Sequence, residues 1–435
     1  MRTFFTIWAG QLVSILGSGL SRFALGVYIY ELSGSATQFG LVLLSATLPS
    51  LLITPVAGAL VDRWDRRTVM ILADTGAALI TLVIWGLLAS DQLALWHIYI
   101  LSALGAILEA FQAPAYTASI TLIVPKEHYG RASGMTQLIE ALAQIVTPIA
   151  AGFLVITIRL EGILMVDFIT FFFAIAALML VHIPKPPPSK EGLESKGSLL
   201  TEVRFGWNYL WKRTGLFGML SLFAVINFAL GFFSALITPM ILSITTPEKL
   251  GTVVSAGGFG LFVGSIIMST WGGAKRKMHS LIGSMIAFGF ALSLMGVSNN
   301  LVVIGAAGFV FFILLPIAAG SSQAIWQRKI PPDLQGRIFS TRSLIASSAR
   351  PLSLLLAGPL ADFVFEPAMQ ANGSLASVLG PFLGVGAGRG IGLLFIIMGL
   401  IIVAANIIGY MNPRIRNVED EIPDFKAEEP SPASG

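Results

Sequence analysis

The sequence predicts an all-helical integral membrane protein whose twelve membrane-spanning helices form two pseudo-symmetric bundles of six. Three observations support this fold class. Hydrophobic residues fill 55% of the 435 positions and charged residues only 11%, whereas a soluble globular chain is about 25% charged. The chain also contains twelve apolar runs near the length that crosses a bilayer, about 20 residues. Finally, a motif of the first half recurs in the second half at a constant spacing.

The predicted spans divide the chain into two bundles, at residues 1–183 and 214–411. The first run, Phe4–Tyr30, is too long for a signal peptide and is expected to remain as a helix. The spans of the first bundle are predicted at residues 5–31, 38–60, 68–89, 96–123, 133–158 and 162–183. Those of the second are predicted at 214–243, 250–272, 279–298, 301–325, 338–364 and 390–411.

The loops on one side of this topology carry most of the basic residues, and the loops on the other side carry few. Basic residues next to spans mark the cytoplasmic side. Both termini are therefore expected in the cytoplasm, and the protein in a bacterial inner membrane. The net charge of +4 then reflects orientation in the membrane rather than nucleic-acid binding. The basic loops hold Arg63, Arg66, Arg67, Lys126, Arg131, Lys275, Arg276, Lys277, Arg328, Lys329 and Arg337.

Two segments outside the bundles differ in composition from the spans. The linker at 184–213 begins with a proline-rich stretch that disfavours a helix. Apolar residues from Leu199 to Trp211 then recur at helical spacing, which predicts an amphipathic helix in the inner membrane interface. A helix that binds a partner protein is the alternative interpretation. The tail at 412–435 is acidic and rich in Pro and Ser towards its end, and is expected to be disordered.

An internal repeat relates the two halves. Val124–Arg131 corresponds to Ile330–Arg337, and the offset from Gly130 to Gly336 is 206 residues. The same offset matches Ala151-Gly152 with Ala357-Gly358. Such parallel repeats are typical of transporter folds that enclose a central cavity.

A charged hairpin separates the second and third spans. Residues 58–67 have the pattern G-x-x-x-D-R-x-x-R-R, which places charges at the boundary between lipid and water. A generic cytosolic turn would also collect Lys and Arg. The pattern resembles the loop signature of the major facilitator superfamily of secondary transporters.

This resemblance implies a latch between the two halves on the cytosolic side. The Asp62 carboxylate is expected to dock on free backbone N–H groups at the start of the eleventh helix, near Phe339–Arg342. Gly58 is expected to allow close helix packing, and the arginines of the hairpin to hold anionic lipid headgroups. The predicted gating residues are Gly58, Asp62, Arg63, Arg66, Arg67, Gly130, Arg131, Gly336 and Arg337.

Ionisable residues inside spans are costly unless they are paired or hydrated, and they often mark function. Four stand out as candidates for proton coupling: Arg22, Glu109, Glu140 and Arg350. Static pairs that fix helix packing are the alternative interpretation. Three further carboxylates are expected to lie near helix ends and to be solvated there: Asp74, Asp167 and Asp362.

Polar side chains on the first, fourth, seventh and tenth spans are candidates for contact with a substrate. Each of them could instead bond a neighbouring backbone carbonyl. These residues are Gln11, Gln112, Tyr116, Asn227 and Gln323.

Nearly the whole chain resembles the drug:proton antiporter-3 branch of the superfamily, which includes macrolide-efflux and enterobactin-exporter types. Gly17-Ser18-Gly19, the Asp62 hairpin, Phe111–Ala115 and the two Gly-Arg loops carry this resemblance. Thr147–Gly152 partly resembles the antiporter motif, with Thr147 and Ala151 in place of glycines. The resemblance implies proton-coupled efflux of an amphipathic small molecule. The alternatives are a lipid or metabolite transporter, an importer of the same fold, or a membrane sensor or scaffold.

Several classes of protein are disfavoured by the residues that the chain lacks. It has no cysteine, its four histidines have no metal-ligand spacing, and it contains no P-loop. We therefore expect neither an enzyme nor a cofactor or metal site. The expected partners are a small amphipathic substrate, protons and membrane lipids, with no nucleic acid, and the protein is expected to be a monomer.

Overall fold

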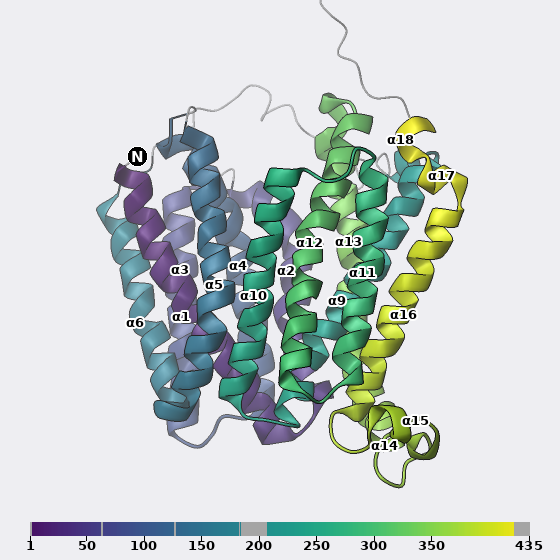
Figure 1. Ribbon diagram of the computed structural model, residues 1–435. Helices are drawn as coiled ribbons and strands as arrows, with labels where there is room; N and C mark the ends of the chain where they lie inside the picture. The colour runs from purple at the N-terminus through teal and green to yellow at the C-terminus, as the bar shows by residue number, and fades with distance from the viewer. Residues whose placement is uncertain (1, 62–63, 126–127, 182, 184–206, 422–435) are drawn as a thin grey trace, which may run out of the picture.

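The computed structural model describes residues 2–61, 64–125, 128–181, 183 and 207–421. Regular secondary structure in this part of the chain is entirely helical. It contains twelve helices that are long and apolar enough to cross a membrane, as the sequence predicts. Figure 1 shows these helices side by side, with the N-terminus and the C-terminal helices α17 and α18 at one end of the molecule. We call this end the termini face and the opposite end the distal face.

The long helices follow the predicted spans closely. Those of the first half are α1 (Arg2–Ser33), α2 (Ala36–Val61), α3 (Arg66–Ala89), α4 (Leu95–Ile123), α5 (Tyr129–Thr157) and α6 (Arg159–Leu180). Those of the second half are α9 (Thr214–Leu242), α10 (Pro247–Trp271), α11 (Lys277–Val297), α12 (Leu301–Lys329), α13 (Pro332–Leu360) and α16 (Arg389–Met411). The largest difference is at α13, which begins at Pro332 rather than at 338, because a proline is readily accommodated in the first turn of a helix.

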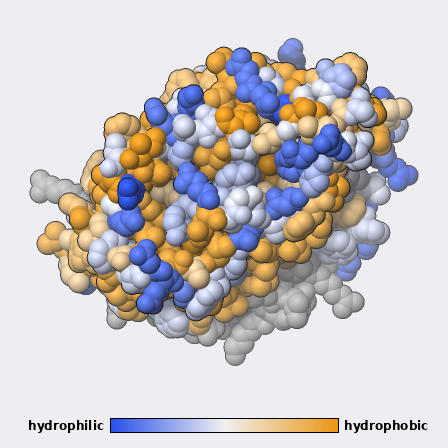
Figure 2. Space-filling model, turned by 90° about the horizontal axis from the view of Figure 1, so that it is seen from below, coloured by the Kyte–Doolittle hydropathy of each residue, from blue (hydrophilic) through white to orange (hydrophobic). Residues whose placement is uncertain are grey.

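The sides of the helices expose many large apolar residues. Leu180 is 82% exposed and Val302 is 77% exposed, and a soluble monomer rarely exposes apolar surface of this extent. Figure 2 looks onto the distal face, where polar side chains lie among apolar ones. This distribution is that of a protein whose sides face lipid and whose ends face water.

The two halves meet along two seams on the distal side. In one seam α5 packs against α10, and the Ser255 hydroxyl donates to the Ile145 carbonyl at 2.7 Å. In the other seam α2 packs against α13. Gly152 and Gly358, which the internal repeat pairs, occupy equivalent places in these seams. A Cβ on Gly152 would lie 2.8 Å from the Pro247 carbonyl oxygen, and one on Gly358 would lie 2.3 Å from Thr37 Cα.

The hydrophobic clusters are distributed in the same way. The largest cluster includes most of the second half and extends into the first half through Val27, Ala36, Leu43 and Val155. At the termini face the first half has clusters of its own, around Ile7 and Met70 and around Phe4 and Val124. Among the described residues, therefore, apolar packing joins the halves at the distal side and leaves them separate at the termini face.

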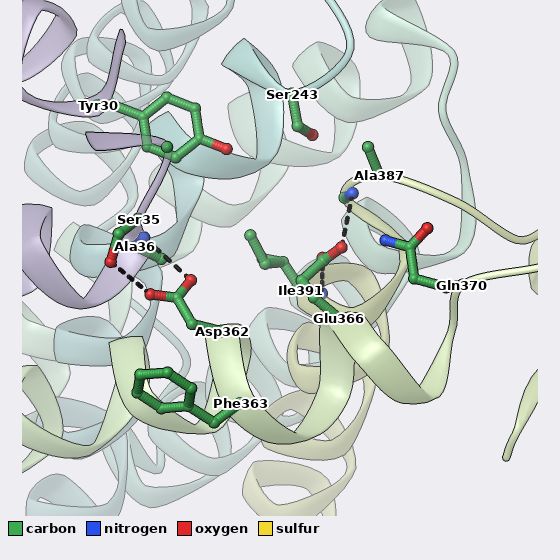
Figure 3. Close-up of a pocket in the computed structure, with 12 residues that line it drawn as sticks. Tyr30, Ser35, Ala36, Ser243, Asp362, Phe363, Glu366, Gln370, Ala387 and Ile391 are labelled. Carbon is green, nitrogen blue, oxygen red and sulfur yellow. Dashed lines mark hydrogen bonds between the residues drawn. The ribbon is translucent and has the colours of Figure 1, made fainter. Parts of the chain in front are cut away.

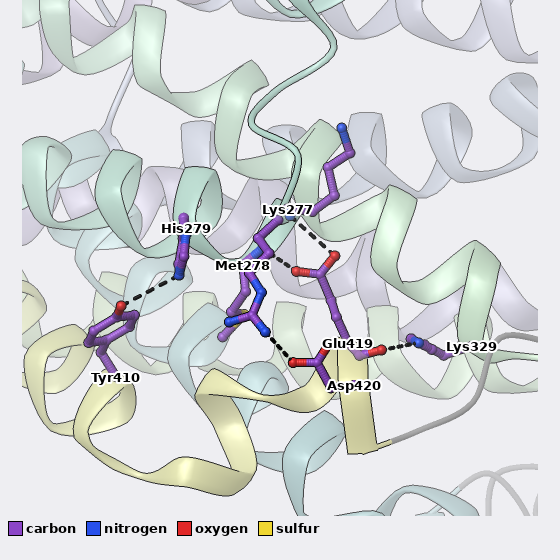
Figure 4. Close-up of polar contacts among 8 residues, drawn as sticks. Lys277, Met278, His279, Lys329, Tyr410, Glu419 and Asp420 are labelled. Atoms are coloured by element: carbon purple, nitrogen blue, oxygen red, sulfur yellow. Dashed lines mark hydrogen bonds and ion pairs between the residues drawn. The ribbon is translucent and has the colours of Figure 1, made fainter.

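The segment at residues 413–421 clamps the termini face of the second half (Figure 4). The Glu419 carboxylate accepts hydrogen bonds from the backbone N–H groups of Lys277 and Met278 at 3.2 and 2.9 Å. Lys329 Nζ donates to the Glu419 carbonyl at 2.5 Å, and Arg276 pairs with Asp420 at 2.5 Å. This segment therefore holds the first turn of α11 against the last turn of α12.

The expectation of a disordered tail from residue 412 is wrong for its first part. Pro413–Arg416 and Val418–Glu421 form the short helices α17 and α18. Ile415 and Val418 are buried, and burying these apolar side chains favours an ordered segment. The rest of the predicted tail lies outside the described residues.

The C-terminal clamp is expected to stabilise the folded protein measurably. Glu419→Ala removes a carboxylate from two N–H groups at a helix N-terminus, which typically costs about 1 kcal/mol. It should therefore lower Tm in a thermal unfolding scan of the detergent-solubilised protein. Glu421→Ala, at an exposed position of the same helix, should leave Tm at the parental value. Equal Tm values for the two variants would contradict a clamping role.

Part of the predicted amphipathic helix is described. Residues 207–211 are helical, and the rings of Trp207 and Trp211 stack with centroids 6.0 Å apart. Both indoles are exposed and also contact Phe217 of α9 edge-on. Residues 199–206 lie outside the described part of the chain, so the interfacial position of this helix stays a prediction.

Candidate functional site

A buried carboxylate lies among the spans of the first half. Asp74 of α3 is 1% exposed and accepts hydrogen bonds from two glutamines. Gln11 Nε2 of α1 donates to Oδ2 at 3.2 Å, and Gln112 Nε2 of α4 donates to Oδ1. Gln112 Nε2 also lies 3.4 Å from Gln11 Oε1. Three helices thus bring together two predicted substrate-contact residues and one acid.

The surroundings predicted for Asp74 are wrong. A solvated carboxylate near a helix end is expected, but Asp74 lies two turns inside α3, where Gln11 of α1 and Gln112 of α4 cover it. No cation among the described residues forms an ion pair with it. A buried carboxylate in such a place is costly as an anion, and binding a proton removes that charge.

Asp167 of α6 is a second buried carboxylate that the sequence analysis expects to be solvated. It is 2% exposed and accepts hydrogen bonds from Ser18 at 3.1 Å and Thr81 at 3.3 Å. Arg22 is close enough to interact with it electrostatically. Asp167 therefore has a positive neighbour within its own half, which Asp74 lacks in the described part of the chain.

The four residues predicted for proton coupling do not come together. Arg22, Glu109, Glu140 and Arg350 are all exposed. Within the described residues, no hydrogen bond or ion pair joins the side chain of one to that of another. The helix-packing pairs offered as their alternative are therefore not formed among these four. Their role in proton coupling stays a prediction.

The second half contains a polar cluster around Arg342 of α13. Its guanidinium donates to Gln323 Oε1 at 3.1 Å and to Ser322 Oγ at 3.4 Å. The Arg342 guanidinium carbon also lies 5.0 Å from the centroid of the buried Trp326 ring. Such a cation–π contact partly compensates the desolvation of the charge. Gln323 thus positions an arginine that the sequence analysis did not select.

The remaining substrate candidates have local partners. Asn227 Nδ2 donates to the Phe223 carbonyl one turn earlier in α9, at 2.9 Å. This is the bond to a neighbouring backbone carbonyl that the sequence analysis gives as the alternative to substrate contact. Tyr116 packs against the apolar cluster around Met70 and Ala115. Neither contact tests whether these side chains meet a substrate.

The charged hairpin is described only in part, and Asp62 and Arg63 lie outside the described residues. No described atom lies within 4 Å of the place where a Cβ on Gly58 would be, so the close helix packing predicted there is not formed.

Arg66 donates to the Ala118 carbonyl at 2.8 Å. Arg67 donates to the carbonyls of Leu178 and Met179 at 2.7 and 2.8 Å.

The two hairpin arginines therefore bind protein rather than lipid through these donors. Leu178 and Met179 lie in the last turn of α6, where carbonyl groups lack partners within the helix and attract cations. The prediction of lipid headgroups as ligands of Arg66 and Arg67 overlooked these carbonyls. The hairpin is thereby fastened to α4 and α6 of its own half.

The docking site predicted for Asp62 is also misplaced. Phe339–Arg342 lies two turns inside α13, and the free N–H groups of this helix are those after Pro331. Of the other predicted gating residues, Arg131 is exposed at the start of α5. Gly130, Gly336 and Arg337 fall within helices, but their side-chain surroundings lie outside the described part of the structure.

A carboxylate at the distal face joins the halves instead. Asp362 lies in the π-helical segment η2 (Ala361–Phe365) that follows α13. Its carboxylate accepts hydrogen bonds from the Ser35 hydroxyl at 2.6 Å and from the N–H groups of Ala36 and Thr37 at 3.0 and 2.8 Å. Asp362 is predicted to be solvated because it lies near a helix end. Its partners are more than 300 residues away along the chain, so the sequence gives no sign of them.

Comparison with known families decides the identity of this helical bundle. The model of the Major Facilitator Superfamily matches residues 7–354. The chain belongs to this superfamily. It is a multi-pass membrane transporter and not an enzyme, as the resemblance of the hairpin and the Gly-Arg loops implies.

Two relatives of this transporter are named as efflux proteins. Macrolide efflux protein A of Streptococcus pyogenes is 28% identical over 369 residues, covering 82% of this chain and 89% of the relative. Multidrug efflux pump Tap of Mycobacterium bovis is 28% identical over 374 residues, covering 82% and 87%. The predicted resemblance to macrolide-efflux proteins is thus confirmed.

Solved structures confirm the transporter fold. The inward-facing, unoccupied bacterial homologue of the human lysosomal transporter Spinster has a TM-score of 0.71 at 13% identity, covering 96% of this chain and 98% of that one. The nucleoside transporter NupG has a TM-score of 0.69 at 12% identity, covering 94% and 99%. At these identities the likeness concerns the fold alone.

Proposed function

We propose that this transporter exports an amphipathic small molecule of the macrolide or multidrug type in exchange for protons. The observation that carries this proposal is the buried Asp74 carboxylate between Gln11 and Gln112. A carboxylate in this place can alternate between a proton-bound, neutral form and an ionised form. The names of the efflux relatives support the class of substrate.

Alternating access supplies the transport cycle in this proposal. The halves are packed together at the distal side and separate in their apolar packing at the termini face. The basic loops on the termini side favour its placement in the cytoplasm of a bacterial inner membrane. The described conformation then corresponds to the state that receives substrate and releases protons on the cytoplasmic side.

Transport by purified protein in proteoliposomes tests this function. A radiolabelled macrolide is expected to accumulate above the level reached in protein-free vesicles when the lumen is more acidic than the medium, because protons leaving the lumen drive the exchange. Nigericin, which collapses the pH gradient in potassium medium, should abolish accumulation. Accumulation only in vesicles with an alkaline lumen would instead indicate transport of substrate together with protons. Equal accumulation with and without the pH gradient would exclude proton coupling.

A further inference from the structure

We propose that Asp362 is the latch of the distal gate. Its carboxylate belongs to the second half and caps the N-terminus of α2 in the first half. The contact exists only while the distal side is closed, so it stabilises that state over the distal-open one. This inference rests on alternating access in the proposed function, but not on the substrate or on proton coupling.

Two of the four backbone N–H groups in the first turn of α2 have their hydrogen-bond partner in this contact. A helix leaves its first four N–H groups without partners inside the helix. Here the N–H groups of Gln38 and Phe39 bond to the hydroxyl and the carbonyl of Ser35, at 3.2 Å in both cases. The N–H groups of Ala36 and Thr37 bond to Asp362. Opening the gate therefore transfers two N–H groups and a carboxylate to water.

Two carboxylates with different tasks lie close together here, Asp362 in the π-helical segment η2 and Glu366 at the first residue of α14 (Glu366–Ala368) (Figure 3). Asp362 bonds across the halves to the residues before and within α2. Glu366, four residues later, accepts from the N–H groups of Gly388 and Ile391 at 3.1 and 2.9 Å, at the start of α16 in its own half. A π-helical turn is often found at functional sites. One carboxylate thus joins the halves, and the other fixes the second half internally.

A cavity of about 390 Å³ adjoins both carboxylates at the boundary between the halves. Its lining includes Tyr30 and Ser35 from the first half and Ser243 and Gln370 from the second half, together with Asp362 and Glu366. Because half of this lining is polar and is supplied from both sides of the seam, water in the cavity can solvate Asp362 as the seam opens. The hydrogen bonds of Asp362 can therefore break and re-form, because water can replace them when the seam opens.

In the described part of the chain, the other distal seam has no such latch. The N-cap residue of α10, Thr246, makes no side-chain capping bond. The internal repeat places Ile156 of α5 where Asp362 stands in the second half. Closure of the α5–α10 seam relies on close packing of Gly152 and Gly251 and on the neutral hydrogen bond from Ser255 to Ile145, whereas closure of the α2–α13 seam adds a charged cap. The distal gate is therefore asymmetric, and the contacts of Asp362 add to the stability of its closed state.

Distance measurements across the distal face test the latch without any substrate. The chain has no cysteine, so nitroxide labels on introduced cysteines report only the chosen positions. Gln92 and Gln370 are exposed and belong to opposite halves, and Thr68 and Lys275 offer an equivalent pair towards the termini face. Asp362→Ala is expected to raise the ratio of distal-open to distal-closed molecules about fivefold, as loss of a helix cap implies. The distance between Thr68 and Lys275 should shorten in the same fraction of molecules.

Glu366→Ala is the matched control, because it removes a cap of two N–H groups that lies within one half. It should lower Tm and leave the Gln92–Gln370 distances at the parental distribution. Asp362→Asn, which keeps an acceptor oxygen but loses the charge, should fall between the parent and Asp362→Ala. Parental distances in both Asp362 variants, or an equal shift in Glu366→Ala, would overturn the latch. A failed transport assay would concern the proposed substrate and coupling, and would leave these distances interpretable.

Discussion

Replacing Gly358 with valine is expected to abolish transport. A Cβ at this position would lie 2.3 Å from Thr37 Cα and 2.7 Å from Thr37 N, so it would overlap the backbone of α2. Backbone atoms cannot move aside as a flexible side chain can, and the halves would have to separate at this seam. Overpacking typically costs 1–3 kcal/mol, which would lower the distal-closed population up to roughly a hundredfold.

Proteoliposome transport and the Gln92–Gln370 distance would both report this effect. Gly358→Val should fold and elute as the parent does, transport at background rates and show long distances across the distal face. Gly105→Val is the control, since no described atom lies within 4 Å of the added Cβ in α4. It should transport at the parental rate. Equal transport by the two valine variants would show that close approach of α2 and α13 is not needed for the cycle.

Asp74→Asn is expected to separate substrate movement from proton movement. Asparagine keeps the size of the side chain and an acceptor for Gln11 or Gln112, but it cannot bind and release a proton at neutral pH. Accumulation of macrolide against its gradient should therefore be lost almost completely. Downhill exchange of macrolide should continue and should no longer depend on pH.

Three variants make this result specific to Asp74. Asp167→Asn changes another buried carboxylate of the same half, one that lies near the charge of Arg22. It should lower Tm and retain gradient-driven accumulation. Glu109→Gln and Glu140→Gln examine the exposed acids that the sequence predicts for coupling. Loss of coupling in either of these two, with Asp74→Asn behaving as the parent, would move the proton site to that acid.

The positions of the twelve spans are predictable from the sequence because hydropathic length is a local property. A stretch of about 20 apolar residues crosses a bilayer whatever its neighbours are, and the described helices begin and end close to the predicted residues. The internal repeat likewise identifies Gly152 and Gly358 as equivalent. Their contact with the opposite half explains why an Ala-Gly pair recurs there.

The partners of the charged residues, in contrast, are not predictable from the sequence. In a membrane protein, lipid and protein interior are both apolar, so hydrophobic periodicity does not reveal which face of a helix meets another helix. The sequence therefore could not tell that Asp74 is covered by α1 and α4, or that Arg67 reaches the last turn of α6. The only sequence signal for Asp74 was its charge within a span.

The superfamily, the number and approximate limits of the spans, and the repeat that relates the halves all follow from the order of residues in the chain. Where the halves touch depends instead on how the helices pack. This packing brings Asp362 to the first turn of α2 across more than 300 residues, and it leaves Glu109 and Glu140 exposed. The reason is that a span is specified by its own residues, whereas a helix cap or a buried carboxylate is specified by the helix that packs against it.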